Sequence, residues 1–211
     1  DIAEAGNGNL WIAHNKGISL FIRKQNRFRN YVIVSDKSGS TEIRSLSVID
    51  GQLWGCGWSG IYIFDAASEK LISPACFDEQ DNTVSSSVTK IIQAPDQIYW
   101  IATANHGLIR YRKAGSRLEK LVTPDLGKVL RVDDILFHPN GHAYLATYDD
   151  GIYECTVEGK ILRHWSEKSK APFKTSLNNT RALAKDRQDR VWVGGFQGLA
   201  FLAPETGQLT E

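Results

Sequence analysis

Apolar and polar residues alternate in short runs along most of the chain, a pattern typical of β-strands with one buried face. Turn-forming residues separate the runs and let the backbone reverse sharply. They occur at Gly6-Asn7-Gly8, Asp50-Gly51, Pro95-Asp96, Gly115-Ser116 and Pro139-Asn140-Gly141. No stretch shows the period of an amphipathic helix, so the pattern predicts an all-β protein built from antiparallel hairpins.

One sequence unit, an aromatic residue followed by a turn and a glycine, returns five times. Successive aromatic residues are 43, 46, 44 and 48 positions apart, close to the roughly 40–50 residues of a four-stranded propeller blade. The repeat therefore predicts a β-propeller with five four-stranded antiparallel blades. The structural anchors are the first and last residues of the segments Trp11–Gly17, Trp54–Gly60, Trp100–Gly107, Tyr144–Gly151 and Trp192–Gly198.

The predicted blades cover approximately residues 1–35, 42–77, 87–123, 131–166 and 180–211, with the first and last incomplete. We therefore expect a longer parent protein, whose further blades complete a larger ring. Each blade should run from an inner strand, through the aromatic strand and the strand after the glycine, to an outer strand such as residues 28–34, 117–122 or 161–165. One blade cannot cover both of its faces, so the aromatic anchors should pack in the core between blades. The residue two positions after each aromatic anchor is small, which predicts a site too tight for a large side chain.

Charge and cysteine content narrow the range of partners. The 25 basic and 24 acidic residues nearly cancel, which disfavours nucleic acid and anionic membranes as partners. The cysteines Cys56, Cys76 and Cys155 are too few and too scattered for a disulfide framework or a paired zinc site. Cys56 and Cys155 occupy small or apolar strand positions, which predicts buried thiols. The sequence thus predicts no cofactor and no metal site.

Three motifs that carry chemistry in other proteins are interpreted here as structural. His138 and His142 have a spacing that binds zinc on a helix, but they flank Pro-Asn-Gly, which predicts a plain turn. Asp186–Trp192 resembles the aspartate box of sialidase-type propellers, which is itself a turn. The adjacent carboxylates Asp133-Asp134 and Asp149-Asp150 should point to opposite faces of a strand. We therefore expect no catalytic residue in this segment.

The repeats resemble the two-component regulator propeller repeat, in which an Asp and a short turn precede an apolar residue, Trp-Ile-Gly-Thr, two variable residues and Gly-Leu. The likeness covers essentially the whole chain, although the Gly-Thr pair reads Ala-His, Cys-Gly or Ala-Thr in the first four copies. It is carried by Ser176–Asp186, Val191–Gly195 with Gly198-Leu199, and Gly8–Ala13 with Gly17-Ile18.

This resemblance implies the periplasmic sensory part of a bacterial protein anchored in the inner membrane. The membrane segment and a histidine kinase or GGDEF-type cyclase output would lie outside this segment, and a homodimer would form through the parent protein. Oligosaccharides are among the ligands known for the family.

The turns after the aromatic strands should emerge together on one face of the ring, where function usually lies. Aromatic rings there could stack on a sugar, while amides and carboxylates satisfy its hydroxyl groups. The sequence thus predicts a non-catalytic site for an oligosaccharide or small polar ligand, against the alternative that these are ordinary hairpin turns. The candidate residues are Trp58, Asn105, His106, Tyr148, Asp149, Phe196 and Gln197.

Two other functions stay open. A protein–protein interaction scaffold would present a broad, flat binding face to a folded partner. A carbohydrate-active propeller hydrolase or lyase would consume its substrate.

Overall fold

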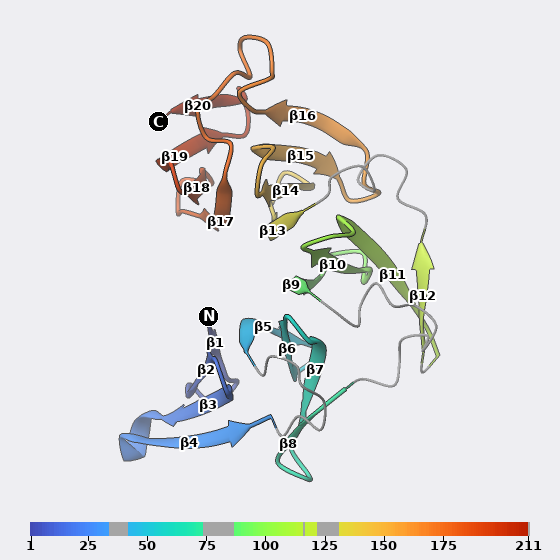
Figure 1. Ribbon diagram of the computed structural model, residues 1–211, viewed down its shortest axis with the longest axis vertical. Coiled ribbons are helices and arrows are strands. Elements are labelled where there is room, and N and C mark those ends of the chain that lie inside the picture. Colours follow the sequence, from blue (N-terminus) through green and yellow to red (C-terminus); the bar gives the residue numbers. More distant parts are fainter. Residues whose placement is uncertain (34–41, 74–86, 116, 122–130, 211) are drawn as a thin grey trace. The chain divides into compact units, whose positions relative to one another are not determined.

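The computed structural model describes residues 1–33, 42–73, 87–115, 117–121 and 131–210. These residues form twenty strands and one short 3₁₀ turn, η1 (Arg23–Gln25). The strands make five four-stranded antiparallel sheets, and within each sheet they lie in chain order (Figure 1). The predicted all-β class and the four-stranded repeat are therefore confirmed.

The first sheet contains β1 (Ile2–Glu4), β2 (Leu10–His14), β3 (Gly17–Ile22) and β4 (Arg27–Val32). The second contains β5 (Ile43–Ile49), β6 (Gln52–Gly57), β7 (Gly60–Asp65) and β8 (Lys70–Ile72). The third contains β9 (Val88–Gln93), β10 (Tyr99–Thr103), β11 (Leu108–Ala114) and β12 (Arg117–Leu121). The fourth contains β13 (Val132–Phe137), β14 (His142–Thr147), β15 (Ile152–Thr156) and β16 (Ile161–Trp165). The fifth contains β17 (Thr180–Lys185), β18 (Val191–Gly195), β19 (Gly198–Ala203) and β20 (Gln208–Thr210).

The outer strands lie close to their predicted bounds. β16 matches residues 161–165, whereas β4 starts one residue earlier than predicted and ends at Val32. Positions 34 and 122, the predicted ends of two outer strands, lie outside the described residues. The first and last sheets both have four strands, of which β1 and β20 are three residues long.

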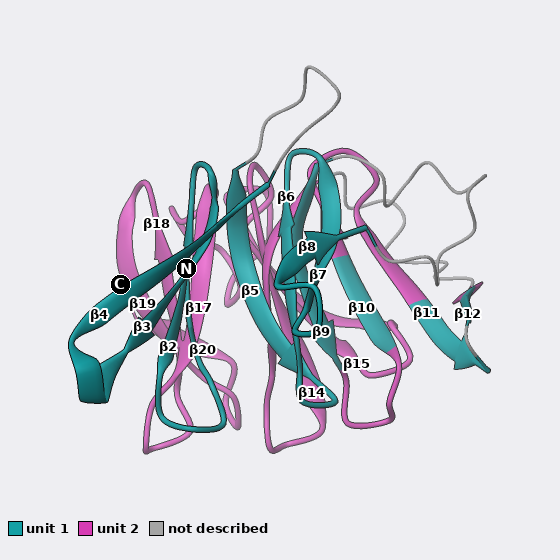
Figure 2. Cartoon of the chain, turned by 90° about the horizontal axis from the view of Figure 1, so that it is seen from below, with its two compact units in different colours: residues 1–93, 99–101, 111–119 teal, residues 94–98, 102–110, 120–211 magenta. Residues whose placement is uncertain are grey.

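The chain divides into two compact units, coloured separately in Figure 2. Unit 1 comprises residues 1–93, 99–101 and 111–119, and unit 2 comprises residues 94–98, 102–110 and 120–211. The first two sheets belong to unit 1 and the last two to unit 2, while the third sheet has residues in each. Each unit has its own hydrophobic core.

In unit 1 the core lies between the first two sheets. The rings of Trp11 and Tyr31 each pack on Phe64, with centroids 4.8 Å apart in both pairs. In unit 2 the buried side chains of Tyr144 and Trp165 pack with three apolar residues of the fifth sheet, Val191, Val193 and Leu202. Burial of such faces between sheets is the main driving force for a repeat whose single sheets cannot fold alone.

Four of the five aromatic anchors are buried, as predicted. Trp11 is 9% exposed, Trp54 5%, and Trp100 and Tyr144 are both 0% exposed. Trp192 departs from the prediction because it is only partly buried. Its indole N–H donates to Asp186 Oδ2 at 2.8 Å, and its ring lies 5.5 Å from that of Phe201. The fifth sheet therefore holds its anchor partly by hydrogen bonding.

The small residue two positions after each aromatic anchor also differs in its surroundings from sheet to sheet. Cys56, Ala102 and Ala146 are fully buried there. At Gly194 an added Cβ would meet no atom within 4 Å, so the tight site predicted at this position is wrong for the fifth sheet.

The backbone conformation at the five glycine anchors explains why the repeat has glycine there. All five have φ between 68° and 139°, a region that residues with a Cβ rarely adopt. At Gly17 a Cβ would also overlap the carbonyl oxygen of Tyr31, and at Gly151 it would overlap that of Trp165. In the first and fourth sheets the outer strand thus passes directly over the glycine, whereas at Gly198 a Cβ would meet nothing within 4 Å.

A repeated carboxylate links successive inner strands within each unit. In unit 1, Asp1 Oδ2 accepts hydrogen bonds from the backbone N–H of Leu46 (2.9 Å) and from Ser45 Oγ (3.1 Å). In unit 2, Asp134 Oδ2 accepts one from the backbone N–H of Leu183 at 2.8 Å. Asp1 and Asp134 occupy the same repeat position, since each lies opposite the small residue that follows the anchor. One inner strand therefore holds the next through its backbone.

Unit 2 also contains a buried carboxylate network. Glu154 of β15 is 0% exposed and accepts hydrogen bonds from Tyr144 Oη (2.9 Å) and Arg163 Nη2 (2.9 Å), while His142 Nδ1 lies 2.7 Å away. Arg163 Nη2 also donates to the carbonyl of Pro204 in the fifth sheet at 2.7 Å. Burial raises the pKa of Glu154, but the hydrogen bonds from Arg163, His142 and Tyr144 outweigh it and hold the pKa below its usual range.

Candidate functional site

The seven candidate residues lie in turns between the second and third strands of their sheets. Trp58 belongs to the β6–β7 turn of unit 1. Unit 2 contains the other six: Asn105 and His106 in the β10–β11 turn, Tyr148 and Asp149 in the β14–β15 turn, and Phe196 and Gln197 in the β18–β19 turn. Tyr148 is partly buried, and the rest are exposed.

In unit 2 the β14–β15 and β18–β19 turns each place an aromatic ring against the same arginine. The guanidinium of Arg181, in β17, lies 4.7 Å from the centroid of the Tyr148 ring and 5.0 Å from that of Phe196. Arg131 lies 4.3 Å from the same Tyr148 ring. We call this group of Arg131, Tyr148, Arg181 and Phe196 the arginine–aromatic stack. Cation–π attraction stabilises such contacts, most strongly where water is excluded.

Asp133 fixes both arginines of the stack. Its Oδ1 accepts a hydrogen bond from Arg131 Nε at 2.9 Å, and its Oδ2 accepts one from Arg181 Nη1 at 2.8 Å. The Asp133 side chain is only 6% exposed, so both bonds are shielded from water. The arginine planes are thereby held against the rings, and half of their charge is neutralised.

Asn179 positions the polar candidates around the stack. Its side-chain nitrogen, directed toward the β14–β15 turn, donates to Asp149 Oδ1 at 3.1 Å and to the Tyr148 carbonyl. Its backbone N–H donates to Gln197 Oε1 at 3.2 Å. An acid and an amide are therefore held near two rings, which is the chemistry predicted for a polar or sugar ligand.

The other two candidates of unit 2 belong to their own turn. The backbone N–H of His106 donates to Thr103 Oγ1 at 2.8 Å, which closes the β10–β11 turn. Both side chains are exposed. The structure thus joins Tyr148, Asp149, Phe196 and Gln197 through Arg181 and Asn179, and it gives Asn105 and His106 no described part in that group.

Trp58 has a similar arrangement in unit 1. Arg44 of β5 lies 4.9 Å from the ring centroid, and the indole N–H donates to Glu42 Oε2 at 3.1 Å. Trp58 is 39% exposed. Its ring therefore keeps an accessible face beside polar groups.

Sequence reasoning missed Arg131, Asp133, Asn179 and Arg181. A signal was present for one of them, because Arg44 and Arg181 each follow the first paired residue of an inner strand. Aligning the inner strands of the repeats would have placed both arginines opposite the aromatic residues Trp58 and Phe196. Arg131 and Asn179 precede their strands and carry no such pattern.

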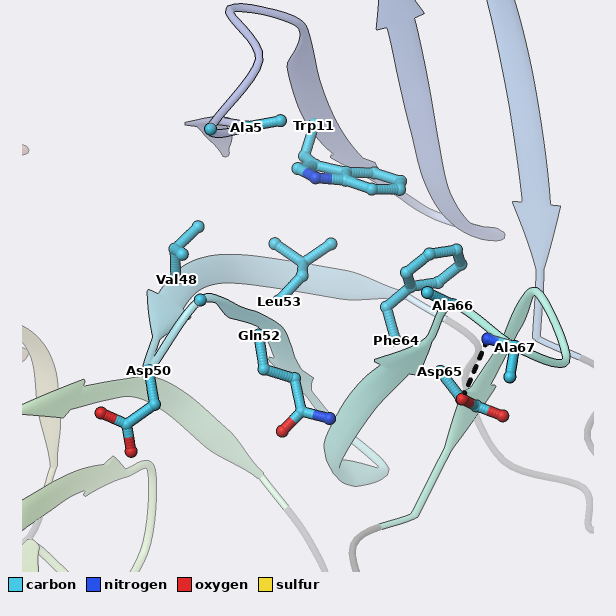
Figure 3. Close-up of a pocket in the computed structure, with 12 residues that line it drawn as sticks. Ala5, Trp11, Val48, Asp50, Gln52, Leu53, Phe64, Asp65, Ala66 and Ala67 are labelled. Carbon is cyan, nitrogen blue, oxygen red and sulfur yellow. Dashed lines mark hydrogen bonds between the residues drawn. The ribbon is translucent and has the colours of Figure 1, made fainter.

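The described part of unit 1 also has a groove at the opposite ends of the strands, beside the β5–β6 and β7–β8 turns. Its volume is about 560 Å³. Figure 3 shows Leu53 and Phe64 directed toward Trp11, while Asp50 and Gln52 point away from it. This groove was not predicted, because it depends on the packing of the first two sheets.

The motifs interpreted as structural have structural partners. His138 Nε2 lies 2.8 Å from the Asp189 carbonyl, whereas His142 contacts Glu154, so the two rings serve different contacts. Cys56 and Cys155 are buried, and burial raises the pKa of each thiol to about 12, which keeps them protonated at neutral pH. Cys76 lies outside the described residues.

The aspartate-box segment forms a turn organised by one carboxylate. Asp186 accepts hydrogen bonds from the backbone N–H groups of Gln188 and Arg190 and from the side chains of Arg190 and Trp192. Burial raises the pKa of Asp186, but these hydrogen bonds outweigh it and hold the pKa below its usual range. The paired carboxylates also act separately: Asp149 contacts Asn179, and Asp150 contacts Tyr153 and His164.

Among the described residues, no group of three or more histidine, cysteine or carboxylate side chains could hold a metal ion. No helix in the described part of the chain is long and apolar enough to cross a membrane.

No family model matches the chain, and no curated protein does. Solved structures do match it. A WD40 propeller domain of Doa1 aligns with 100% of the chain and 66% of its own length, with a TM-score of 0.68 and 13% identity. The chain is a β-propeller.

Two further matches have different described roles. One is an extracellular domain assigned to a one-component system of Bacteroides thetaiotaomicron, with a TM-score of 0.76, 20% identity, and coverage of 100% of this chain and 27% of that domain. The other is virginiamycin B lyase of Staphylococcus aureus, with a TM-score of 0.69, 15% identity, and coverage of 99% and 67%. This propeller spans about a quarter of the extracellular domain. At such identities the likeness establishes the fold alone.

Proposed function

We propose that this chain is an extracytoplasmic, ligand-sensing part of a bacterial membrane-anchored signalling protein, and that it binds a small polar or carbohydrate ligand without converting it. The observation that carries the proposal is the arginine–aromatic stack of unit 2. Phe196 forms the outer end of that stack and is 72% exposed, although large apolar side chains are usually buried.

The stack suits a sugar because it combines a flat apolar surface with fixed polar groups. Arg181 supports one face of the Phe196 ring, so the ring can offer the other face to a ligand. Asp149 and Gln197 can then pair with hydroxyl groups that would otherwise lose their hydrogen bonds to water. Both side chains are already held by Asn179, which lowers the entropic cost of ordering them.

The described carboxylates near the stack support binding over catalysis. A glycosidase needs two carboxyl groups that face each other across the scissile bond, about 5–10 Å apart. Here Asp133 is shielded and engaged by two arginines, and Asp149 and Asp150 bind different partners. These carboxylates hold neighbouring side chains in place.

The similarity to an extracellular domain of a bacterial one-component system supports a sensory role. In this proposal the membrane segment and the signalling output belong to other parts of a periplasmic parent protein. A homodimer formed through that parent would carry the change in ligand occupancy to the output.

The test is a binding screen of the 211-residue chain against neutral and uronate-containing oligosaccharides, by isothermal titration calorimetry. For a sugar that binds, Phe196→Ala should weaken affinity about tenfold, near the upper range of one aromatic contact. Leu199→Ala is the matched control, since Leu199 is 61% exposed in the adjacent strand and makes no described contact with the stack. Equal losses in both variants, or the absence of binding to every oligosaccharide, would contradict the site.

Product analysis of the same mixtures tests the non-catalytic part. Chromatography of each oligosaccharide after prolonged incubation should show it unchanged. Accumulation of a cleaved or unsaturated sugar would establish a hydrolase or lyase instead.

A further inference from the structure

Unit 1 has a second hollow, whose floor is apolar and aromatic. It lies between the β5–β6 and β11–β12 turns and has a volume of about 220 Å³. Its floor consists of Ile49, Trp54, Ile63, Tyr99 and Leu118, each less than 9% exposed. The rings of Trp54 and Tyr99 lie 5.8 Å apart at 45°. Such a floor suits a small, flat apolar group.

The rim of this pocket carries charge. Lys113, Arg117, Asp50 and Gln52 line it. Asp50 Oδ2 accepts a hydrogen bond from Tyr99 Oη at 3.4 Å and lies 4.0 Å from Lys113 Nζ. Within the described part of the chain, no ion pair is found for Arg117. Two cations and one engaged carboxylate leave the rim with a net positive charge.

The floor also contains an unmatched donor. Trp54 lines the pocket, is 5% exposed, and its buried indole N–H has no acceptor among the described residues. Most buried donors in folded proteins have a partner. A ligand packed on the Trp54 ring would therefore change the surroundings of an N–H that no described residue fixes.

We infer that this pocket binds a small carboxylate with a flat apolar body. The carboxylate pairs with the Arg117 guanidinium, whose planar donors match its two oxygens. The body packs on Trp54 and Tyr99. The site lies at the opposite ends of the strands from Trp58, shares no residue with the arginine–aromatic stack, and takes a chemically different ligand.

The test uses 3-phenylpropionate and its neutral analogue 3-phenylpropanamide as probes of the full chain in calorimetry. The acid should bind at least tenfold more tightly than the amide, and Arg117→Gln should remove that preference. Arg112→Gln is the matched control, because Arg112 is exposed on the neighbouring strand and does not line the pocket. Equal binding of acid and amide, or equal effects of the two substitutions, overturns the proposal.

Nitrogen–proton correlation spectra keep the test valid if a variant fails to fold. The indole N–H signal of Trp54, assigned by its loss in Trp54→Phe, should shift when 3-phenylpropionate is added to the unaltered chain. An unchanged signal at saturating ligand rules out the placement on Trp54. Glucuronate, which has the charge without the apolar body, should bind more weakly than 3-phenylpropionate, and tighter binding would also overturn it.

The two proposals fail independently. Phe196→Ala should leave 3-phenylpropionate binding unchanged, and Arg117→Gln should leave binding of a neutral oligosaccharide unchanged.

Discussion

Glu154 is the residue whose surroundings constrain it most. Its carboxylate is fully buried, yet three side chains from two neighbouring strands satisfy it. One of them, Arg163, continues to the carbonyl of Pro204 in the next sheet. A buried charge of this kind is tolerated only while every partner stays in place.

Replacing Glu154 with Gln should therefore destabilise the protein by roughly 2–4 kcal/mol, because Arg163 loses its counter-charge. The estimate lies near the low end for buried pairs, since the Arg163 side chain is 22% exposed and water can partly compensate it. Urea unfolding followed by circular dichroism gives the free energy of unfolding. Glu205→Gln, at an exposed position, should change it by less than about 0.5 kcal/mol. Equal values for the two variants would contradict the role of the network.

The same residue predicts a dependence on pH. The folded-state pKa of Glu154 lies below its ordinary value of 4.5, so the unfolded chain binds a proton more readily than the folded one. The stabilisation is complete above pH 4.5 and is lost as pH falls through the folded-state pKa. Unfolding midpoints measured from pH 7 down to pH 3 should fall less steeply for Glu154→Gln than for the unaltered chain. Parallel curves would rule out this contribution.

At the scale of the strand hairpin, a glycine can be required for two reasons. The backbone can need a positive φ, and a neighbouring strand can leave no room for a Cβ. Gly151 has φ of 70°, and a Cβ there would overlap the Trp165 carbonyl oxygen. Gly141 has a similar φ of 85°, but a Cβ would meet nothing within 4 Å. Substitutions at these two glycines therefore separate the cost of a strained backbone from the cost of a steric clash.

Gly141→Ala should cost about 1–2 kcal/mol, the usual penalty of the left-handed region. Gly151→Ala should cost at least about 2 kcal/mol more, because the outer strand must also move away from the new methyl group. Thermal and urea unfolding of both variants measure the difference. If Gly151→Ala proves no worse than Gly141→Ala, the outer strand is more adaptable than its geometry indicates.

These hairpins could be predicted from the sequence, since glycine at a fixed distance from an aromatic residue reports a local backbone requirement. The arginine–aromatic stack could not be predicted in the same way. Arg181 meets Tyr148 only because β17 lies beside the β14–β15 turn, and that neighbourhood depends on the packing of two sheets. Candidate aromatic residues were found from their turns, whereas the arginines that support them were not.

Across the whole molecule the five repeats are equivalent in sequence and unequal in burial. Trp100 is 0% exposed, whereas Trp192 is only partly buried. The repeat pattern alone cannot reveal this difference, because it assigns the same packing role to every anchor.

Trp100→Ala should therefore destabilise the chain by about 3–5 kcal/mol, the cost of emptying a large core site. Trp192→Ala should cost about half as much, since part of its surface already contacts water. Comparison of their urea midpoints, together with the unaltered chain, checks the order. A larger loss at Trp192 would show that its hydrogen bond to Asp186 matters more than burial.

The carboxylates of Asp1 and Asp134 have a consequence for how such a molecule can grow. Each one recognises a peptide N–H of the following inner strand, a group that every residue except proline offers. The bond to the peptide N–H itself imposes no demand on the side chain of the following repeat, although Ser45 adds a hydrogen bond from its hydroxyl group in unit 1. A gene segment encoding one repeat can thus be copied beside itself and then diverge freely, while the junction between old and new copies stays intact.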